Sequence, residues 1–396
     1  MKVTIVGGGF GGVKTALELA KNKANDIVLI SDKDYFQYYP ALYSTATGHA
    51  HLESWTPLGE IFAGIDNVRV DIDTITKIDP NTKELTGASG MKYAYDTCVL
   101  ALGSVTTFFG IKGMGEFAYG IKTEAEIKRL KQHIYQTVAE HKTLDHNYVI
   151  VGGGATGVEL AASLGEYLKR LVHKYRVKNH RVRITIVEAS PRLLPRSAEI
   201  TSHKVTQRLK KLGVHVITGK KVESADDHGM IVSGRPMETS TIIWTSGVAN
   251  NPFFEANKKW FEFAPNHRII VDEHMMARPD VYVIGDNAAT KYGGLALTAV
   301  RDAKFLASHL ERKAHHHRQT EYKQKSPAVV IPVGGWWAAF EWKGIRLYGW
   351  PAGIMRRAAD VVGYSDILPF TRAFAKVRSG TLIEDDYFTP TPGGRK

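Results

Sequence analysis

Short apolar runs that end at glycine open two similar stretches of the chain. Residues 2–6 (KVTIV) lead into a glycine-rich loop, apolar positions then recur with helical spacing over 13–22, and a second apolar run covers 27–30. Apolar runs of this length are typical of strands buried in a parallel sheet. The same order of strand, glycine loop, helix and strand returns between residues 148 and 187. The pattern therefore predicts an α/β protein with two nucleotide-binding domains of similar plan.

Further strand-like and helical segments surround these two units. Between the units, residues 68–102 alternate as strands do, and residues 124–140 have a helical pattern. After the second unit we expect strands at 214–218, 230–233, 241–245 and 281–284. Residues 311–328 are polar and contain His315–His317, and we interpret them as an exposed loop or helix end. We expect no metal site there, because no acidic or cysteine ligands are spaced nearby.

The two glycine loops carry the first chemical signal. Each has the pattern G-x-G-x-x-G between a predicted strand and a predicted helix. The glycines concerned are Gly7, Gly9 and Gly12, and then Gly152, Gly154 and Gly157. The first glycine permits a tight turn, the second lets the backbone approach a diphosphate, and the third lets the helix pack close to the strand. Two such loops predict two bound dinucleotides, each with its phosphates at a helix N-terminus.

The residue after each second strand indicates which dinucleotide binds. Glu188 closes that strand in the second unit, where a carboxylate takes the ribose hydroxyls of NADH and repels the extra phosphate of NADPH. In the first unit the equivalent position is Ser31, which is followed by Asp32. The Ser31 hydroxyl can still hydrogen-bond a ribose hydroxyl, but more weakly than a carboxylate does. Gly285-Asp286 follows another predicted strand, where an aspartate can hold the ribityl chain of FAD. We therefore expect NADH to pass hydride to a bound flavin.

Taken together, these segments resemble the two-dinucleotide flavoprotein superfamily. Within it they resemble type II NADH:quinone oxidoreductases, the single-subunit NADH dehydrogenases that do not pump protons. The superfamily-wide segments are the glycine loops, LALGS (100–104), IVEASPRLLP (186–195), WTSGV (244–248) and VYVIGDNAA (281–289). The more specific ones are DYFQYYPALYSTATG (34–48) and FFGIKGMGEFAYGIKT (108–123). The resemblance covers nearly the whole chain and implies two Rossmann-like domains in a glutathione-reductase-like arrangement.

The resemblance also implies which residues bind the two dinucleotides. For FAD, bound tightly but non-covalently, they are Gly7, Gly9, Phe10, Gly11, Gly12, Ser31, Asp32, Lys33, Ile75, Ala101, Leu102, Gly103, Gly285, Asp286, Ala296 and Leu297. For NADH, the substrate, they are Gly152, Gly153, Gly154, Ala155, Thr156, Gly157, Glu188 and Gly247. Glu159 corresponds to a family carboxylate near the nicotinamide and the flavin, and it is our candidate catalytic residue. The alternative for Glu159 is a carboxylate that only complements the helix dipole.

One segment departs from the family pattern. The family carries A-Q-x-A-x-Q on the helix beside the flavin and the quinone, whereas this chain has Leu297 and Arg301 at the two glutamine positions. Arg301 can hydrogen-bond a quinone carbonyl. The resemblance therefore implies a quinone pocket formed by Tyr39, Pro40, Tyr43 and Arg301. The two replacements also leave a different electron acceptor open.

Composition narrows the choice among these relatives. The chain has 396 residues, of which 43% are hydrophobic and 23% charged, and these values are typical of a protein with two or three globular domains. Cys98 is the only cysteine. The chain therefore lacks the reactive thiol pair that disulfide reductases and sulfide:quinone oxidoreductases require, and we interpret Cys98 as a core residue of its predicted strand. Reductases of small electron-carrier proteins need no thiols and stay open.

The net charge of +12 predicts an anionic partner. Half of the excess lies in residues 311–396, where 14 lysines and arginines outnumber 8 acidic residues. Apolar positions there recur with helical spacing over 354–362 and 367–377, with basic residues between them. Such basic amphipathic segments bind anionic lipid surfaces. The alternative is a helical hairpin packed on the body of the protein or on a second subunit.

We therefore predict an FAD-dependent NADH:quinone oxidoreductase, peripheral at the cytoplasmic face of the cell membrane and homodimeric, with no signal peptide and no transmembrane helix. Its predicted partners are NADH, menaquinone or ubiquinone, and an anionic membrane surface, but no nucleic acid. The predicted domains are 1–108 with 250–330 for FAD, 109–249 for NADH, and 331–396 for membrane association. The alternatives are a soluble reductase of a small electron-carrier protein, of the ferredoxin-reductase type, and a non-catalytic flavin-bound sensor.

Overall fold

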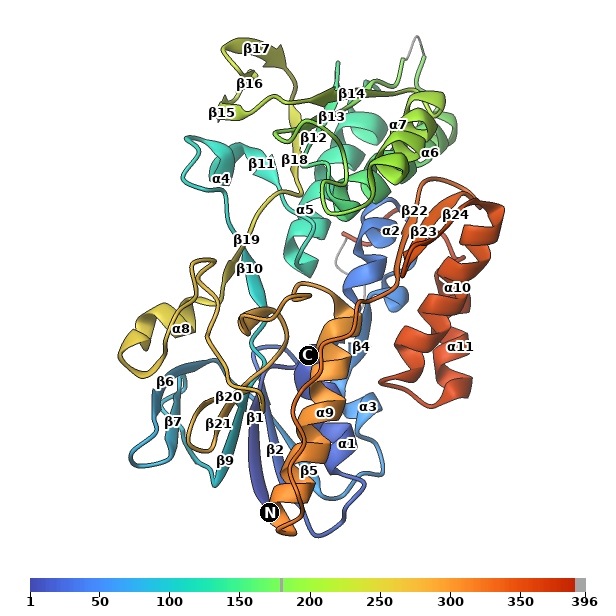
Figure 1. Cartoon of the computed structure of the whole chain (residues 1–396). Helices are drawn as coiled ribbons and strands as arrows, with labels where there is room; N and C mark the ends of the chain where they lie inside the picture. The colour runs from blue at the N-terminus through green and yellow to red at the C-terminus, as the bar shows by residue number, and fades with distance from the viewer. Residues whose placement is uncertain (179–180, 389–396) are drawn as a thin grey trace, which may run out of the picture.

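The computed structural model describes residues 1–178 and 181–388. Its first sheet has six strands in the order β20-β21-β9-β1-β2-β5 (Figure 1). These are β1 (Lys2–Val6), β2 (Asp26–Ser31), β5 (Val68–Ile72), β9 (Thr97–Leu100), β20 (Met276–Arg278) and β21 (Val281–Val283). All neighbouring strands are parallel except β20 and β21 at the edge. One sheet thus takes strands from before residue 101 and from after residue 275.

Two long helices bury the apolar side chains of this sheet. Val3 and Ile5 of β1 are fully buried, as the run KVTIV predicts. Helix α1 (Phe10–Leu19) starts directly after the first glycine loop, with Gly9 as its N-cap, and so begins earlier than the predicted residue 13. It packs along α9 (Ala296–Ala314) (Figure 1). The predicted histidine run 315–317 follows the end of α9 and is exposed, as expected.

Small β elements and short helices complete the lower half of the molecule. A three-stranded antiparallel sheet packs on the core through Ile78 and Leu85. Its strands are β6 (Ile75–Asp79), β7 (Glu84–Gly87) and β8 (Lys92–Ala94). The other elements are β3 (Tyr35–Gln37), η1 (Tyr39–Ala41), α2 (Leu42–Ala46), η2 (His51–Glu53), β4 (Trp55–Pro57), α3 (Leu58–Ile61), α8 (Pro252–Ala256), η4 (Lys258–Trp260) and η5 (Gly285–Asn287).

The second sheet has five parallel strands in the order β11-β18-β12-β13-β14. They are β11 (Ala118–Tyr119), β12 (Tyr148–Val151), β13 (Ile184–Glu188), β14 (Val214–Thr218) and β18 (Thr241–Trp244). The helices here are α4 (Met114–Phe117), α5 (Glu124–Tyr135) with the π-turn η3 (Gln136–Glu140), α6 (Ala155–Tyr175) and α7 (Glu199–Lys211). A small sheet of β15 (Val222–Asp226), β16 (Gly229–Val232) and β17 (Arg235–Glu238) lies beside them. The predicted strands and the helix over 124–140 are thus present.

Two chain crossings connect the two sheets. β10 (Ser104–Thr106) and β19 (Val248–Asn250) form an antiparallel pair that runs between them (Figure 1). A third connection is made by side chains: Leu42 and Ala46 of α2, with Trp55 of β4, belong to the hydrophobic core around α6. A segment of the first half therefore helps to build the core of the second half, which fixes their relative position through apolar burial.

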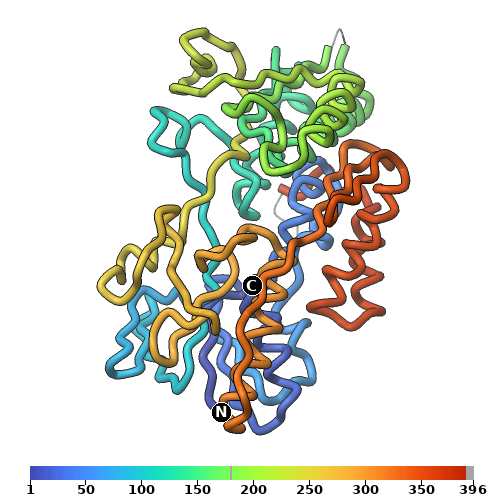
Figure 2. The backbone as a smooth tube through the Cα atoms, in the orientation of Figure 1, coloured from blue at the N-terminus to red at the C-terminus, as the bar shows by residue number. Residues whose placement is uncertain are grey.

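The C-terminal region forms a lobe on one flank, beside α2 and α6 (Figure 2). It consists of β22 (Val329–Pro332), β23 (Ala338–Trp342), β24 (Ile345–Gly349), α10 (Trp350–Ser365) and α11 (Phe370–Ser379). Both predicted amphipathic helices are present. None of the helices in the described parts of the chain has the length and apolarity to cross a membrane. The last residues of the predicted region, 389–396, lie outside the described residues.

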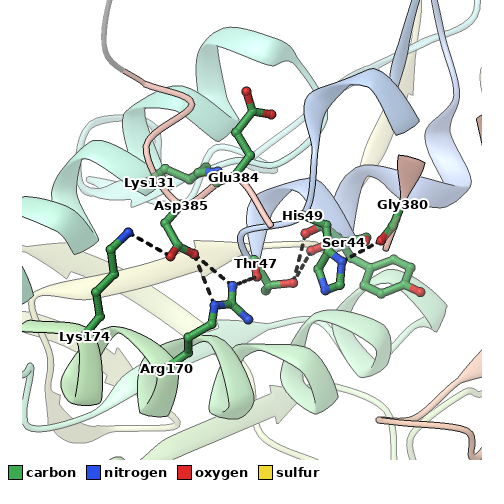
Figure 3. A network of polar contacts seen from close by, with 10 residues as sticks. Ser44, Thr47, His49, Lys131, Arg170, Lys174, Gly380, Glu384 and Asp385 are labelled. Carbon is green, nitrogen blue, oxygen red and sulfur yellow. Dashed lines mark hydrogen bonds and ion pairs between the residues drawn. The ribbon is translucent and has the colours of Figure 1, made fainter. Parts of the chain in front are cut away.

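After α11 the chain returns to the body, and we call residues 382–388 the C-terminal strap. Asp385 of the strap is 5% exposed and pairs with Arg170 at 3.0 Å and with Lys174 at 3.2 Å, both on α6 (Figure 3). Lys131 of α5 donates a hydrogen bond to the backbone carbonyl of Glu384. The Glu384 carboxylate in turn accepts from the backbone N–H of His51 at 2.8 Å. The strap is thereby held by residues from both halves of the molecule.

Candidate functional site

The first glycine loop has the geometry of a diphosphate site. Gly7 has a left-handed backbone, with φ 118°, and a Cβ there would overlap the carbonyl group of Ala101. A Cβ on Gly12 would overlap the carbonyl oxygen of Gly7, because α1 lies close to β1. Gly9, by contrast, has nothing within 4 Å of its Cβ position. The protein's own packing therefore requires glycine at positions 7 and 12. At position 9 the protein leaves room for a side chain, so glycine is needed there only if a ligand approaches the backbone.

The second glycine loop repeats these three roles. Gly152 also has φ 118°, and a Cβ there would overlap the Ser246 hydroxyl. A Cβ on Gly157 would overlap the carbonyl oxygen of Gly152. Gly154 has nothing within 4 Å of its Cβ position. Two loops with the same division of roles, each at the N-terminus of a long helix, form two matching places for a diphosphate.

A cavity of about 690 Å³ extends from the first loop toward the second, which is a size suited to a cofactor. Fourteen predicted FAD residues line it: Gly7, Gly9, Phe10, Gly11, Ser31, Asp32, Lys33, Ile75, Ala101, Leu102, Gly103, Gly285, Asp286 and Ala296. The predicted NADH residues Thr156 and Gly247 line it as well. Gly12 and Leu297 do not line the cavity, and neither do the other predicted NADH residues.

The predicted ribose-binding residues stand beside their glycine loops. A Cβ on Gly8 would overlap the Ser31 hydroxyl, so Ser31 lies directly against the first loop. Glu188 occupies the equivalent place in the second loop, where its carboxylate accepts from the backbone N–H of Gly153 at 2.6 Å and of Ser190 at 2.6 Å. Ser31 and Glu188, which occupy equivalent positions at the ends of their strands, thus also lie at equivalent places beside their glycine loops.

The cavity wall contains polar atoms that suit a bound flavin. Ser104 donates to the Asp286 carboxylate at 2.8 Å, and Lys122 donates to the Ser104 hydroxyl at 2.9 Å. Burial lowers the pKa of the Lys122 ammonium to about 8. Gln37 donates to the Lys122 carbonyl at 2.6 Å, but its own Oε1 is buried without a partner among the described residues. A buried acceptor left unpaired is costly, and a ligand N–H in this cavity would satisfy it.

A cluster of buried ionisable side chains, centred on Arg356, lies where α2, α6 and α10 approach one another. Burial raises the pKa of the Glu159 carboxyl on α6 to about 8, while the nearby Arg356 guanidinium on α10 lowers it. Arg356 pairs with Asp360 at 3.0 Å and donates to the backbone carbonyl of Pro40 at 3.0 Å. Burial also raises the pKa of Tyr43, which interacts electrostatically with both Arg356 and Glu159. Two predicted pocket residues, Pro40 and Tyr43, and the candidate catalytic Glu159 therefore all interact with Arg356.

Aromatic hydroxyl groups extend this cluster along α10. The ring of Tyr38 stacks on Tyr364 at 3.9 Å, and its hydroxyl donates to the Asp360 carboxylate at 3.2 Å. Tyr364 donates to the backbone carbonyl of Glu53. Burial raises the pKa of the Glu53 carboxyl to about 7, although Ser44 donates to it at 2.9 Å. Three carboxyl groups with raised pKa values, those of Glu53, Glu159 and Asp360, thus lie around α10.

The predicted role of Arg301 in a quinone pocket stays a prediction, because neither Arg301 nor its predicted neighbours Pro40 and Tyr43 line the cavity. Arg301 does not line the cavity, and its guanidinium donates to the backbone carbonyl of Lys325 at 2.9 Å. It thereby holds the segment that follows α9, because its side chain leaves the helix away from the face that packs inward. Tyr39 does line the cavity. Arg356 of α10 is the guanidinium that lies beside Pro40 and Tyr43.

Cys98 is fully buried in β9, as predicted. Burial raises the pKa of its thiol, so the reactive thiolate is disfavoured. The chain has no second cysteine with which to form a disulfide. Cys98 therefore cannot form an intrachain disulfide, and its burial keeps it in the unreactive thiol form.

Comparison with known proteins places this geometry in a family. Residues 1–303 match the family model of pyridine nucleotide-disulphide oxidoreductases. The chain belongs to this family. Like other pyridine nucleotide-disulphide oxidoreductases it has an α/β fold with parallel sheets, although its single cysteine cannot form an intrachain disulphide.

Individual relatives cover almost the whole oxidoreductase. It is 27% identical to the type II NADH:quinone oxidoreductase of Staphylococcus saprophyticus over 382 residues, which are 91% of this chain and 94% of the relative. The structure of NDH2 from Plasmodium falciparum in complex with NADH matches with a TM-score of 0.81 at 18% identity, covering 95% of this chain and 98% of that one. The sulfide:quinone oxidoreductase of Aquifex aeolicus matches with a TM-score of 0.79 at 19% identity, covering 96% and 92%. The two structural matches show a shared fold.

Proposed function

We propose that this oxidoreductase is an FAD-dependent NADH:quinone oxidoreductase that does not pump protons. The observation that carries the proposal is the pair of open glycine positions, Gly9 and Gly154, at the N-termini of two helices that a single cavity connects. Two dinucleotides held this way are arranged for hydride transfer between them. The staphylococcal relative, which is named a type II NADH:quinone oxidoreductase, supports the choice of acceptor.

The cavity residues fit FAD. When bound, FAD takes a hydride from NADH and passes the electrons on to a quinone. The N-terminus of α1 would hold its diphosphate, Ser31 and Asp32 would bind its ribose, and the Asp286 carboxylate would accept from its ribityl hydroxyls, since all of these residues line the cavity. Gln37 Oε1 supplies a buried acceptor on the same wall.

The second loop is the proposed NADH site. The N-terminus of α6 receives the diphosphate, and the Glu188 carboxylate, already fixed beside Gly153, meets the adenosine ribose. The same carboxylate repels a 2′-phosphate, so the enzyme prefers NADH to NADPH. Glu188→Ala should erode that preference, and an unchanged ratio of kcat/KM values for the two nucleotides would dismiss the role given to Glu188.

The reaction converts NADH, one proton and a quinone into NAD⁺ and a quinol. One proton therefore has to reach the quinone from a protein group or from water. The pKa of Glu159 is raised to about 8, so this buried carboxyl is protonated at neutral pH and holds a proton at its carboxyl oxygen. Arg356 stabilises the carboxylate left behind. The proposed quinone pocket is thus Tyr39, Pro40, Tyr43 and Arg356, with Glu159 as the proton donor.

We also propose that the C-terminal lobe docks on an anionic membrane surface. Its large exposed apolar residues are Trp336, Trp342, Ile345, Leu347, Trp350, Ile354, Met355, Val362, Phe370 and Phe374. Basic side chains accompany them, and Arg357 stacks on Trp336 at 4.5 Å. The other face of the hairpin packs on the body through Tyr364, Ile367 and Ala373. The helices thus use one face for packing and leave an apolar, basic face exposed, which is the pattern of an interfacial helix.

Point substitutions test the membrane proposal better than a deletion, because removing the helices would also remove buried Tyr364 and Ile367. We expect the double variant Trp350→Ser/Phe370→Ser to lose sedimentation with vesicles that contain anionic lipid. Ile72→Ser, at an exposed apolar position far from the lobe, is the matched control. If the double variant sediments like the control, the lobe is not the docking surface.

One assay tests the function itself. The purified protein is analysed for its flavin and then mixed with NADH and either a menaquinone analogue, a ubiquinone analogue or a ferredoxin-like carrier. We expect quinone reduction well above the oxygen background. Faster transfer to the carrier than to either quinone would instead support the soluble reductase, and no transfer to any acceptor would support the sensor.

The domain bounds 1–108 with 250–330, 109–249 and 331–396, the homodimer and the cytoplasmic membrane face belong to the same proposal. Sedimentation equilibrium of the purified protein tests the dimer. Fractionation of cells and protease access to inside-out vesicles test the membrane face.

A further inference from the structure

Two arginines from different halves of the molecule line the same cavity. Arg196 lies in the loop between β13 and α7, next to the second glycine loop's sheet. Arg268 lies between η4 and β20, in the half that carries the first glycine loop. The function proposed above uses neither residue.

The two guanidinium groups converge on one point. A Cβ built on Gly294, in the loop before α9, would lie 3.5 Å from Nη2 of Arg268 and 4.0 Å from Nη1 of Arg196. A Cβ on the preceding Gly293 would overlap Nη1 of Arg268. The adjacent glycines therefore leave room for the two side chains to meet above this loop.

No carboxylate of the described residues forms an ion pair at this meeting point. Neither Arg196 nor Arg268 forms an ion pair with a carboxylate in residues 1–178 and 181–388. Like charges held this close repel each other, and they are stable together when an anion sits between them. Arginine is the residue best suited to a phosphate, because its planar fork donates two parallel hydrogen bonds.

The loop that carries Arg196 is fixed to the second glycine loop. The backbone N–H of Leu194 donates to the carbonyl oxygen of Gly153 at 2.8 Å, and the N–H of Ser197 donates back to the carbonyl of Leu194 at 2.9 Å. Arg196 is therefore held beside the loop where the NADH diphosphate is expected. Arg196 and Arg268 both line the cavity that a dinucleotide bound at this loop would enter.

We propose that Arg196 and Arg268 form a clamp, one arm from each half of the molecule, for the diphosphate of the nicotinamide dinucleotide. The proposal rests on the proposed use of NADH but not on the identity of the electron acceptor. The clamp adds affinity for the phosphates common to NADH and NADPH, whereas Glu188 discriminates between the two nucleotides. It also links the two halves electrostatically only when the substrate is present.

The test uses the flavin-loaded protein and two readouts that need no quinone. The first is the dissociation constant of ADP-ribose, which carries the diphosphate without the nicotinamide, measured by calorimetry. The second is anaerobic bleaching of the flavin over a range of NADH concentrations. We expect Arg196→Gln and Arg268→Gln each to weaken both affinities about tenfold, as loss of a charge-assisted hydrogen bond does. Arg196→Lys and Arg268→Lys, which keep the charge, should recover part of the loss.

Lys291→Gln is the matched control, because it removes a positive charge near the same loop from a side chain that does not line the cavity. Affinities within twofold of the wild type in both glutamine variants would overturn the clamp. Loss of bound flavin from those variants, with unchanged ADP-ribose affinity in the flavin-loaded fraction, would overturn it as well, because the anion would then belong to FAD. Failure of quinone reduction with intact flavin bleaching would reject the proposed acceptor and leave the clamp standing.

Discussion

Arg356 on α10 donates a hydrogen bond to the backbone carbonyl of Pro40, 3.0 Å away. The same guanidinium is the cation that lowers the pKa of Glu159, in opposition to burial. One side chain of the C-terminal lobe therefore acts on the carboxyl group proposed as proton donor. The C-terminal lobe thus interacts with the proposed proton donor electrostatically, in addition to packing against the body of the protein.

Replacing Arg356 should change the pH profile of quinone reduction. Without the cation, the pKa of Glu159 rises above its value of about 8, so the protonated form persists to higher pH. We expect the basic limb of the profile for Arg356→Met to move upward by about one pH unit. Arg356→Lys, which keeps the charge, should leave the limb near its wild-type position. Glu159→Gln is the control that removes the titrating group, and an unmoved limb in Arg356→Met would disconnect Arg356 from it.

Glu53 makes the stability of the fold depend on pH. Its pKa rises from an ordinary value of 4.5 to about 7 because the carboxyl is buried. The folded state therefore holds a proton that the unfolded state releases, and this stabilisation is lost as pH rises from about 4.5 through 7. We expect Glu53→Gln to have a higher Tm than the wild type at pH 8.5 and a similar Tm at pH 4.5. A Tm difference that is the same at both pH values would contradict this account.

The two kinds of glycine in the first loop should fail in different ways. Gly9→Ala meets nothing within 4 Å in the protein, so the variant should fold with a near-wild-type Tm but lose most of its bound flavin. Gly12→Ala places a methyl group on the carbonyl oxygen of Gly7, so it should lose both flavin and thermal stability. The measurements are the flavin-to-protein ratio and the melting curve. Full flavin occupancy in Gly9→Ala would contradict the proposal that the FAD diphosphate binds at Gly9.

The C-terminal strap should contribute measurably to stability through Asp385. Asp385→Asn leaves Arg170 and Lys174 without their shared carboxylate, and because both cations are partly exposed we expect a loss of about 1–2 kcal/mol in the free energy of unfolding. Glu255→Gln, which breaks an exposed ion pair with Lys258, should cost less than about 0.5 kcal/mol. Equal effects of the two substitutions, measured by denaturant unfolding, would show that the strap is held by other contacts.

Local patterns were sufficient to predict the two nucleotide-binding units and their glycine loops, whereas the family resemblance supplied most of the residues that line the cavity. Apolar runs before glycine predict β1 and β12, and the loop pattern predicts the distinct roles of Gly7, Gly9 and Gly12. These features depend on neighbours in sequence, so periodicity and spacing contain them. Cys98 could likewise be placed in the core from its strand alone.

The place of Arg356 beside Pro40 and Tyr43 could not be predicted in the same way. Arg301 and Arg356 both sit on amphipathic helices with similar flanking residues, and sequence spacing does not say which helix packs its arginine inward. That choice depends on α10 returning to meet Pro40, more than 300 residues earlier in the chain. The entry of Leu42 and Trp55 into the second core and the convergence of Arg196 with Arg268 are tertiary features of the same kind.

The strap also has a consequence for how the protein is made. Glu384 contacts His51 across 333 positions of sequence, and Asp385 contacts α6 across more than 200. On the ribosome, the two halves can form their sheets as they emerge, but these closing contacts have to wait until residues 384 and 385 have been synthesised. A chain that stopped before residue 382 would thus have complete nucleotide domains but would lack the strap's contacts. In such a chain Lys131, Arg170 and Lys174 would lose their partners in the strap, and the loosened C-terminal region would be open to quality-control proteases.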